Sequence, residues 1–346
     1  MGAVRTLIVD DSASMRAALR RILAADAEIE VVGMAPDPFV AREMIKTLNP
    51  DVVTLDVEMP GMDGLSFLER IMRLRPMPVV MCSTLTARGA EVTIEALRLG
   101  AVDYVTKPAG NPEEIEREAA ILREKVKAAA RSLLRPRAEI APVAQGTMEG
   151  SGGEERLIAI GCSTGGVEAL FSLLPALPMD CPPVLIVQHM PAAFTRSFAH
   201  RLDTECRVRV TEARDGDPVR AGSVYIAPGG DAHMELAGGV RGTIRLRPGD
   251  PVSGHRPSVD RLFHSVAAVG PAAVGVILTG MGADGADGLL AMRGAGARTF
   301  GQSRETCVVW GMPRAAAECG AVEKEITLSA LPETILRACR ETVRSH

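Results

Sequence analysis

The chain has 346 residues, of which 47% are hydrophobic, 24% are charged and 3% are aromatic, a composition typical of a globular protein with room for two domains. Its formal net charge of −4 argues against a protein that coats nucleic acid, because such a protein would be basic. No apolar run approaches the roughly 20 residues that a membrane span requires, so we expect no direct membrane insertion.

The cysteines and the N-terminus bear on the cellular compartment. The chain has seven cysteines, an odd number, with no C-x-x-C pair, and most stand in apolar surroundings as buried reduced thiols do. The N-terminus runs directly into a strand-like segment and lacks the pattern of a signal peptide. We therefore expect a cytoplasmic protein with neither a disulfide framework nor a zinc site.

Residues 1–110 alternate short apolar runs with helix-like stretches. Continuous apolar strands that alternate with helices indicate a parallel sheet covered on both faces. Asn111 then caps a long charged helix that begins at Pro112 and continues to about Leu134. The predicted strands are 6–9, 31–34, 52–55, 79–82 and 103–105, and the predicted helices between them are 15–24, 38–48, 65–74 and 90–99.

Residues 135–155 have no period and many helix breakers, so we interpret them as a linker. A second strand–helix series follows, and residues 234–247 are predicted to form an antiparallel excursion that turns at Gly238-Gly239. We therefore predict two doubly wound α/β domains, a flavodoxin-like one over 1–125 and a larger three-layer αβα one over 156–346. The predicted strands of the second are 157–160, 184–187, 208–210, 224–226 and 274–278, and its helices are 194–202, 259–269, 286–293 and 332–343.

Acidic and cationic residues follow the strands of the first half, at the sheet edge where ligands of parallel sheets gather. Crowded carboxylates repel one another, and a divalent cation with oxygen ligands relieves that repulsion, while a hydroxyl and an ammonium suit a phosphoryl group. Any single strand-end aspartate is equally well explained as a helix cap or turn former. The full set in this order indicates a phosphoryl site: Asp10, Asp11, Asp56, Ser83 and Lys107.

Residues 1–125 resemble the receiver domain of a two-component response regulator, through Val9-Asp-Asp-Ser12, Leu55-Asp-Val-Glu-Met-Pro-Gly-Met-Asp-Gly64 and Tyr104-Val-Thr-Lys-Pro108. The resemblance implies that Asp56 accepts a phosphoryl group from a histidine kinase. It also implies Mg²⁺ on Asp11, Asp56 and the backbone carbonyl of Glu58, with Asp10 nearby. Ser83 and Lys107 match positions that sense the phosphoryl group, and Tyr104 matches the aromatic switch residue.

In the second half, Gly161-Cys-Ser-Thr-Gly165 follows a predicted strand and precedes a helix. It satisfies G-x-S-x-G, in which a strained turn exposes a serine hydroxyl, and N–H groups at the helix start can bind an oxyanion. The alternative is a Gly-rich phosphate or dinucleotide loop, to which the run is a weak match. The loop alone leaves both readings open.

A serine nucleophile needs a base and an acid that orients the base. His189 directly follows an apolar strand and is expected at the same sheet edge as Ser163, whereas His255 lies in a loop. A lone strand-end histidine is more often structural. Asp284 follows a third strand, and its rival Asp287 is expected one turn into a helix. The order Ser, His, Asp differs from that of α/β-hydrolases, so the motif does not indicate that family.

Residues 156–346 resemble the catalytic domain of the chemotaxis-type protein-glutamate methylesterases. The resemblance implies Ser163 as nucleophile, His189 as base, Asp284 as orienting acid, and supporting roles for Thr164 and the backbone N–H of Met281. Cys162 stands where members of that family often have Ala, and Ala283 stands where they commonly have Asn, but neither is a triad position. Alternation along the strand predicts that the Cys162 thiol points into the core. The matching stretches are 160–166, 188–191, 227–230, 257–263, 278–286 and 308–314.

The resemblance implies hydrolysis of glutamate methyl esters on chemoreceptor helices, glutamine deamidation at the same positions, and inhibition by the unphosphorylated receiver. No cofactor is expected in the catalytic half. A nucleic-acid-binding output is disfavoured because residues 156–346 show no basic recognition helix. A nucleotide-binding or inactive docking domain would need no base and acid at neighbouring strand ends. The cognate kinase, the receptors, the pathway's output, the rates and the oligomeric state are not readable from the sequence.

Overall fold

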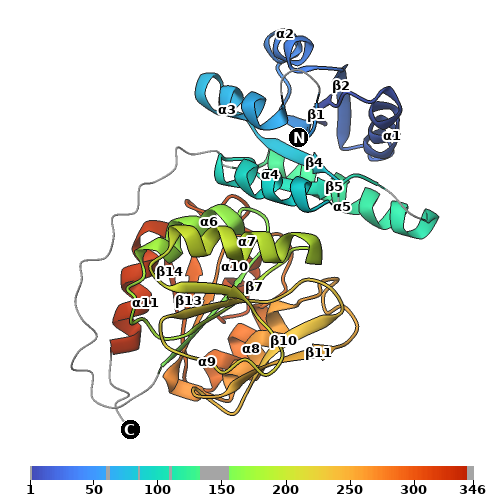
Figure 1. Cartoon of the computed structure of the whole chain (residues 1–346). Coiled ribbons are helices and arrows are strands. Elements are labelled where there is room, and N and C mark those ends of the chain that lie inside the picture. The colour runs from blue at the N-terminus through green and yellow to red at the C-terminus, as the bar shows by residue number, and fades with distance from the viewer. Residues whose placement is uncertain (1, 60–62, 85, 109–110, 133–155, 341–346) are drawn as a thin grey trace. The chain divides into compact units, whose positions relative to one another are not determined.

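A computed structural model of the chain describes residues 2–59, 63–84, 86–108, 111–132 and 156–340. The chain divides into two compact units, Met1–Pro136 and Arg137–His346, and each contains its own parallel sheet (Figure 1). The predicted linker, residues 135–155, lies outside the described residues. Within the described ranges, no helix is both long enough and apolar enough to cross a bilayer.

The first unit contains every strand and helix predicted for it, with small differences at their ends. Its strands are β1 (Val4–Val9), β2 (Ile29–Ala35), β3 (Val52–Asp56), β4 (Val79–Ser83) and β5 (Asp103–Thr106), and its helices are α1 (Ala13–Ala24), α2 (Pro38–Leu48), α3 (Gly64–Leu74), α4 (Ala87–Arg98) and α5 (Pro112–Ala130). The five strands pair in parallel in the order β2-β1-β3-β4-β5. This order is the flavodoxin-like one, which confirms the predicted fold class.

Local sequence explains where α2 and α3 begin. The Asp37 carboxylate accepts hydrogen bonds from the N–H groups of Phe39 and Val40 at the start of α2. Pro38 stands in the first turn, where a backbone N–H has no partner within the helix, so the N–H that proline lacks is not missed. The Asp63 carboxylate accepts the N–H of Ser66 and caps α3 in the same way. These caps fix the first residues of the two helices.

The second unit is larger and holds a seven-stranded sheet. Its strands are β6 (Leu157–Cys162), β7 (Val184–Gln188), β8 (Arg209–Glu212), β9 (Ser223–Ile226), β12 (Ala273–Ile277), β13 (Arg298–Gln302) and β14 (Lys324–Ile326), and its helices are α6 (Gly166–Leu173), α7 (Ala192–Glu205), α8 (Val259–Ala267), α9 (Ala286–Gly294), α10 (Met312–Glu318) and α11 (Leu331–Arg340). All pairs are parallel in the order β14-β13-β12-β6-β7-β9-β8. In Figure 1, α6 and α7 lie on one side of this sheet and α8 and α9 on the other.

An antiparallel pair, β10 (Ala232–Ala237) with β11 (Thr243–Pro248), stands apart from the main sheet and confirms the predicted excursion. Gly238 and Gly239 in its turn have φ of 88° and 75°, a conformation that favours glycine. The strands β13 and β14 and the helix α10 were not predicted. Thr299, Gln302 and Ser303 are polar residues in and after β13, so the apolar pattern that indicates a buried strand is broken there.

The core of the second unit holds the strand ends in place. Every residue of β6 and β7 is buried, which explains why both appear in the sequence as unbroken apolar runs. Leu157 and Leu185 belong to one hydrophobic cluster with Phe263 of α8. On α6 and α7, the rings of Phe171 and Phe198 meet edge to face at 5.8 Å. The loops that follow β6, β7 and β12 therefore extend from a rigid base.

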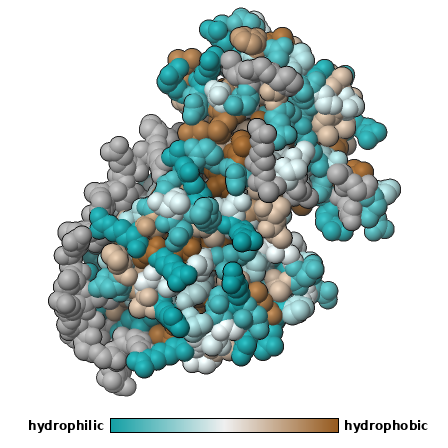
Figure 2. Space-filling view, in the orientation of Figure 1, coloured by the Kyte–Doolittle hydropathy of each residue, from teal (hydrophilic) through white to brown (hydrophobic). Residues whose placement is uncertain are grey.

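The surface is mostly polar. In the face drawn in Figure 2, hydrophilic residues predominate and hydrophobic residues show in a few patches. Among the described residues, few large apolar side chains are strongly exposed, and half of them lie on α2 and α3: these are Phe39, Val40 and Leu74, with Ile121, Met179 and Leu290 elsewhere.

Candidate active site

Ser163 lies in the turn between β6 and α6, as predicted. Its N–H donates to the carbonyl of Thr279 at 3.1 Å, and its own carbonyl accepts the N–H of Gly166 at 2.8 Å. Gly165, with φ of 77°, allows this tight turn without strain from a side chain. The turn leaves Ser163 partly exposed, and the Ser163 hydroxyl has no hydrogen-bond partner among the described residues.

His189 directly follows β7, the strand next to β6, just as Ser163 directly follows β6. Cys162 of β6 pairs in register with Gln188 of β7, so Ser163 and His189 are the next residues of two strands about 5 Å apart. The N–H of His189 donates to the carbonyl of Cys162 at 3.1 Å. The side-chain amide of Gln188 donates to the carbonyls of Ser163 at 2.9 Å and His189 at 3.2 Å. The Gln188 side chain therefore links the backbone of the Ser163 turn to that of the His189 loop.

The imidazole of His189 is nearly buried and is oriented by Asp284. Its Nε2 lies 2.8 Å from Oδ2 of Asp284, and its side chain is only 6% exposed. Nδ1 is buried and has no hydrogen-bond partner among the described residues. Because Nε2 faces a carboxylate, the neutral ring carries its proton there, and Nδ1 is left as the basic nitrogen. The ring also stacks on that of His255.

Asp284 is buried and accepts four hydrogen bonds. Besides His189, its donors are the hydroxyl of Ser258 at 2.8 Å and the N–H groups of Val259 at 2.8 Å and Asp260 at 3.1 Å. These last three residues begin α8, so the carboxylate also lies at the positive end of a helix. Burial would raise the pKa of Asp284, but His189 and the N–H groups of α8 outweigh burial and lower it to about 2. The carboxylate is therefore ionised at neutral pH.

Two further aspartates lie near this position. Asp260 is buried beside Asp284 and accepts the N–H of Gly288 at 2.7 Å. Burial, with the charge of Asp284 added, raises the pKa of Asp260. Asp287, the alternative acid in the sequence, is exposed on α9 and makes no hydrogen bond to His189. The structure therefore brings Asp284, and not Asp287, to the histidine.

The remaining predicted residues surround the Ser163 turn. The thiol of Cys162 is fully buried, as its alternating position predicts, and burial raises its pKa, so it is unsuited to act as a thiolate nucleophile. Thr164 is buried, and its carbonyl accepts the hydroxyl of Thr279 at 3.0 Å. Met281 follows Gly280, which packs against Ser163 so closely that an added Cβ would lie 2.9 Å from the serine Cβ. The N–H of Met281 donates to no acceptor in the described part of the chain.

The sequence did not indicate Gln188 or Ser258 as site residues, and it indicated His255 only as the less favoured alternative to His189 as the base. Ser258 stands directly before a predicted helix, so its role as helix cap could be predicted from the sequence. Its hydrogen bond to Asp284 could not. Gln188 and His255 act through contacts between segments far apart in sequence. No local pattern marks such contacts.

In the first unit, the predicted phosphoryl site assembles around Lys107. Its Nζ lies 2.8 Å from Oδ2 of Asp10 and 2.8 Å from Oδ2 of Asp56. The Asp10 contact is close but poorly directed, because the same oxygen makes no hydrogen bond of good geometry. Burial raises the pKa of Asp56, against the opposing effect of Lys107. Burial acts to lower the pKa of Lys107, but its contacts with the two carboxylates outweigh burial and raise that pKa.

These carboxylates fit a divalent cation. Oxygens of Asp10, Asp11 and Asp56 lie within 4.8 Å of one another, and Asp11 is exposed to solvent. Oxygen-only donors of this kind suit hard cations such as Mg²⁺. The N–H of Glu58 donates to Oδ1 of Asp56 at 3.3 Å, so the Glu58 backbone also borders the site.

Ser83 and Tyr104 lie on the neighbouring strands β4 and β5. Ser83 is one residue beyond Cys82, which pairs in register with Asp56, and its hydroxyl donates to the carbonyl of Thr84 at 3.2 Å. The Tyr104 ring is buried, and the ammonium of Lys125 lies 4.7 Å from its centre. The structure thus places Ser83 at the strand end beside that of Asp56, and it buries the Tyr104 ring.

Residues 158–335 match the family described as CheB methylesterase, and residues 6–119 match the response regulator receiver domain. The chain belongs to the CheB methylesterase family. A Caulobacter vibrioides protein named "Protein-glutamate methylesterase/protein-glutamine glutaminase 1" is 58% identical over 340 residues, 97% of this chain and 98% of the relative. A Rhizobium etli protein named "Protein-glutamate methylesterase/protein-glutamine glutaminase" is 55% identical over 337 residues, 96% of each chain.

A solved structure supports membership of the CheB family. The crystal structure of the Thermotoga maritima CheB methylesterase catalytic domain matches with a TM-score of 0.51 and 38% identity, over 53% of this chain and 98% of that one. The part of this chain that it covers corresponds in size to the described residues of the second unit, 156–340. The resemblance stated from the sequence is therefore confirmed, and so is the predicted fold class.

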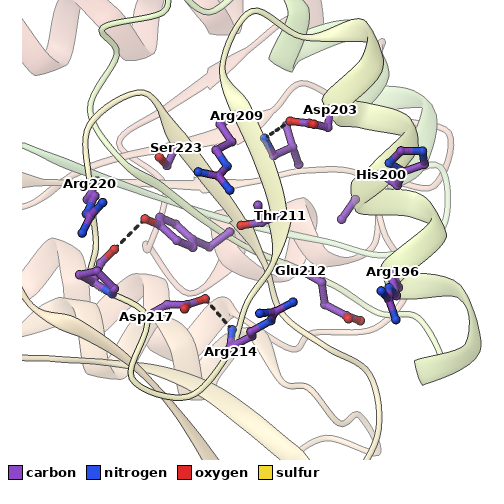
Figure 3. A pocket seen from close by; sticks show the side chains of 14 residues that line it. Arg196, His200, Asp203, Arg209, Thr211, Glu212, Arg214, Asp217, Arg220 and Ser223 are labelled. Atoms are coloured by element: carbon purple, nitrogen blue, oxygen red, sulfur yellow. Dashed lines mark hydrogen bonds between the residues drawn. The ribbon is translucent and has the colours of Figure 1, made fainter.

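A separate hollow of about 650 Å³ lies at the edge of the CheB-type sheet, between α7, β8 and β9 (Figure 3). Its lining mixes arginines with three carboxylates, and each carboxylate accepts a hydrogen bond: Asp203 from the N–H of Val210, Glu212 from the hydroxyl of Thr195, and Asp217 from the N–H of Arg214. No lining residue comes from the loops of Ser163, His189 or Asp284. We therefore assign this hollow no part in the active site.

Proposed function

We propose that this chain is a phosphorylation-regulated serine hydrolase that removes methyl groups from glutamate esters of chemoreceptors, releasing methanol, and deamidates receptor glutamines to glutamate. The observation that carries this proposal is the 2.8 Å bond between His189 and Asp284, at the strand edge that also bears Ser163. The names of the relatives supply the substrate class. The setting that we propose is the cytoplasm, where chemoreceptor helices are the protein substrate.

In the first step, Ser163 acts as nucleophile, His189 as general base and Asp284 as orienting acid. Nδ1 of His189 takes the hydroxyl proton while Oγ of Ser163 attacks the ester carbonyl, and the imidazolium then returns the proton to the departing methoxide. Asp284 is ionised and holds Nε2, so it fixes the tautomer and stabilises the imidazolium. The N–H of Met281 is the proposed donor to the oxyanion, and Thr164 supports the same turn.

In the second step, water hydrolyses the glutamyl-serine ester. His189 takes a proton from water as its oxygen attacks, the bond to Oγ breaks, and the proton passes back to Ser163 while glutamate is released. With a glutamine substrate, ammonia leaves in the first step. An amide is a poorer acyl donor, so deamidation depends more strongly on proton donation by His189.

For the first unit, we propose a receiver role over residues 1–125, with 135–155 as linker and 156–346 as catalytic domain. A chemotaxis histidine kinase donates the phosphoryl group to Asp56, and Ser83 and Lys107 contact it, with Tyr104 as the switch residue. Mg²⁺ would be held by Asp11, Asp56 and the Glu58 carbonyl, with Asp10 nearby, and would neutralise charge there. The unphosphorylated receiver inhibits the catalytic unit.

Methanol release from membranes that carry methylated chemoreceptors tests the proposed function. The full chain should release methanol, more of it with acetyl phosphate and Mg²⁺, and Ser163→Ala should release none while still accepting a phosphoryl group at Asp56. Phosphorylation of the variant shows that its first unit is folded, and an unchanged melting temperature by Trp310 fluorescence shows that its second unit is folded. Turnover that persists in Ser163→Ala would remove the serine from the mechanism.

A further inference from the structure

A groove of about 450 Å³ runs between α2 and α3 of the first unit. It is lined by residues 38, 39, 42, 45 and 46 of α2 and by residues 67, 70, 71, 73, 74 and 75 in and after α3. Spacings of three and four residues place these positions on one face of each helix. Hydrophobic grooves on other proteins bind amphipathic helices in this way.

The groove exposes two large apolar side chains, one from each helix. Phe39 is 66% exposed and Leu74 is 70% exposed, and both line the groove. The other six of the seven phenylalanines are buried. Beneath the two exposed residues, the buried Phe67 and Ile71 form an apolar floor. Exposed apolar surface of this kind, in a hollow with a polar rim, is typical of a protein-binding site.

The rim of the groove is cationic. Five cations line it, and no aspartate or glutamate does: the cations are Arg42, Lys46, Arg70, Arg73 and Arg75. Lys46 pairs with Glu43 at 2.7 Å, and Arg75 donates to the carbonyl of Ile45 and to the side chain of Asn49. The guanidinium groups of the other three make no ion pair with the described residues. The rim therefore offers unused donors to carboxylates.

We propose that this groove binds an acidic amphipathic segment of a partner protein. An apolar side chain of the segment inserts between Phe39 and Leu74, and its carboxylates face Arg42, Arg70 and Arg73. A protein segment fits better than a membrane, because a flat bilayer surface cannot reach the floor at Phe67. It also fits better than nucleic acid, because an apolar floor offers nothing to a phosphate backbone.

The groove is separate from the phosphoryl site. None of its lining residues is among the predicted phosphoryl-site residues. α3 begins beside Asp56, where a Cβ on Gly64 would lie 2.0 Å from the Asp56 carbonyl oxygen, and the groove starts farther along at Phe67. A partner docked here leaves Asp56 open to a phosphodonor. This inference does not depend on the esterase activity.

Selection from a random 12-residue peptide library displayed on phage, against the full-length chain, tests the proposal. We expect enriched peptides to place aromatic or aliphatic residues beside several aspartates or glutamates. Synthetic copies should bind the chain and lose about tenfold or more in affinity to F39A/L74A and to R42E/R70E/R73E. Copies with Asn and Gln in place of Asp and Glu should lose binding similarly.

Matched controls lie on α5. Ile121→Ala removes another exposed apolar side chain, 44% exposed, and Arg117→Glu reverses another exposed charge, so both should bind the peptides normally. Acetyl phosphate should phosphorylate Asp56 equally in all variants. Enriched peptides that are not acidic, or that bind the groove variants equally well, overturn the proposal. So does groove-dependent binding to phosphatidylserine vesicles, or groove-dependent dimerisation, in the absence of peptide binding.

Discussion

The ring of His255 lies parallel to the ring of His189, with centroids 3.7 Å apart and planes 9° from parallel. His255 comes from the loop before α8, whereas His189 follows β7. The stack covers one face of the His189 ring, while the bond to Asp284 fixes its Nε2. Rotation of the ring is therefore restricted from two directions, and Nδ1 is held in one orientation.

Removing this stack should slow the reaction without abolishing it. Aromatic pairs are worth about 0.5–1.5 kcal/mol, so His255→Ala should lower kcat for ester hydrolysis by roughly 2- to 12-fold. His255→Phe keeps a flat ring in the stack and should recover most of the loss. The measurement is kcat against pH for both variants. If Phe is as poor as Ala, stacking is not what positions His189.

Asp284→Asn should have a far larger effect. The amide cannot hold the His189 tautomer or stabilise the imidazolium, and loss of such a carboxylate lowers kcat on the order of 10⁴-fold in serine hydrolases with this arrangement. The variant also loses the negative charge at the start of α8, so its melting temperature should fall. Steady-state kinetics and thermal unfolding check both effects. A kcat within tenfold of the parent would contradict the role of Asp284.

Gly280→Ala should misplace the nucleophile. The added Cβ would lie 2.9 Å from Cβ of Ser163 and 2.3 Å from Sδ of Met312. The methionine end can move aside, but Ser163 is held by the β6 turn, so the serine shifts and activity falls on the order of 100-fold. Gly294→Ala, where nothing lies within 4 Å, is the matched control and should retain full activity. Equal activities would show that the turn tolerates displacement.

Asp260→Asn should change the pH dependence of stability. The pKa of Asp260 is raised above its usual 3.8 by burial and by the charge of Asp284. Ionisation is therefore harder in the folded state, and its cost to stability develops as pH rises from 3.8 through the folded pKa. The variant lacks this cost, so its melting temperature should gain on that of the parent as pH rises above about 4.

Fluorescence of Trp310 measures thermal unfolding of the unit that contains Asp260, because the chain has one tryptophan and it lies in the second unit. The Asn side chain can still accept the N–H of Gly288, so the loss of that bond does not obscure the trend. A difference in melting temperature that shrinks as pH rises would show that the Asp260 pKa is not raised.

The isolated fragment 156–346 should be more active than the unphosphorylated full-length chain. A linker of about 20 residues keeps the receiver at high effective concentration near the catalytic unit, so inhibition needs only a weak contact. Initial rates of methanol release from the same receptor membranes compare the two proteins, with the phosphorylated full-length chain as control. Equal initial rates for the fragment and the unphosphorylated chain would remove the inhibitory part of the proposal.

The sequence predicted elements best where burial is continuous. Strands such as β6 and β7 are buried on both faces, so each is an apolar run with clear ends. β13 escaped prediction because it buries polar groups that find partners: the Thr299 hydroxyl donates to the carbonyl of Ala321, and Gln302 accepts the N–H of Thr279. Such satisfied polar residues make a central strand resemble a loop in the sequence.

The candidate site was predictable to the extent that it follows from strand ends. Ser163 and His189 were placed at one edge by the pattern alone, and register confirms that placement. Asp284 was also proposed from the pattern, because it follows a third strand, but its contact with His189 depends on the loop after β12 and was not readable from the sequence. The contacts of Gln188 and Ser258 join segments distant in sequence, so only three-dimensional packing brings them to the site.

The most direct test is the site of covalent labelling by a fluorophosphonate, read by mass spectrometry of the digested full-length chain. We predict a single adduct on the peptide that contains Ser163, formed much more slowly in His189→Gln and Asp284→Asn. An adduct on Cys162 or another residue, or a labelling rate at Ser163 that does not change when His189 is replaced, would contradict it.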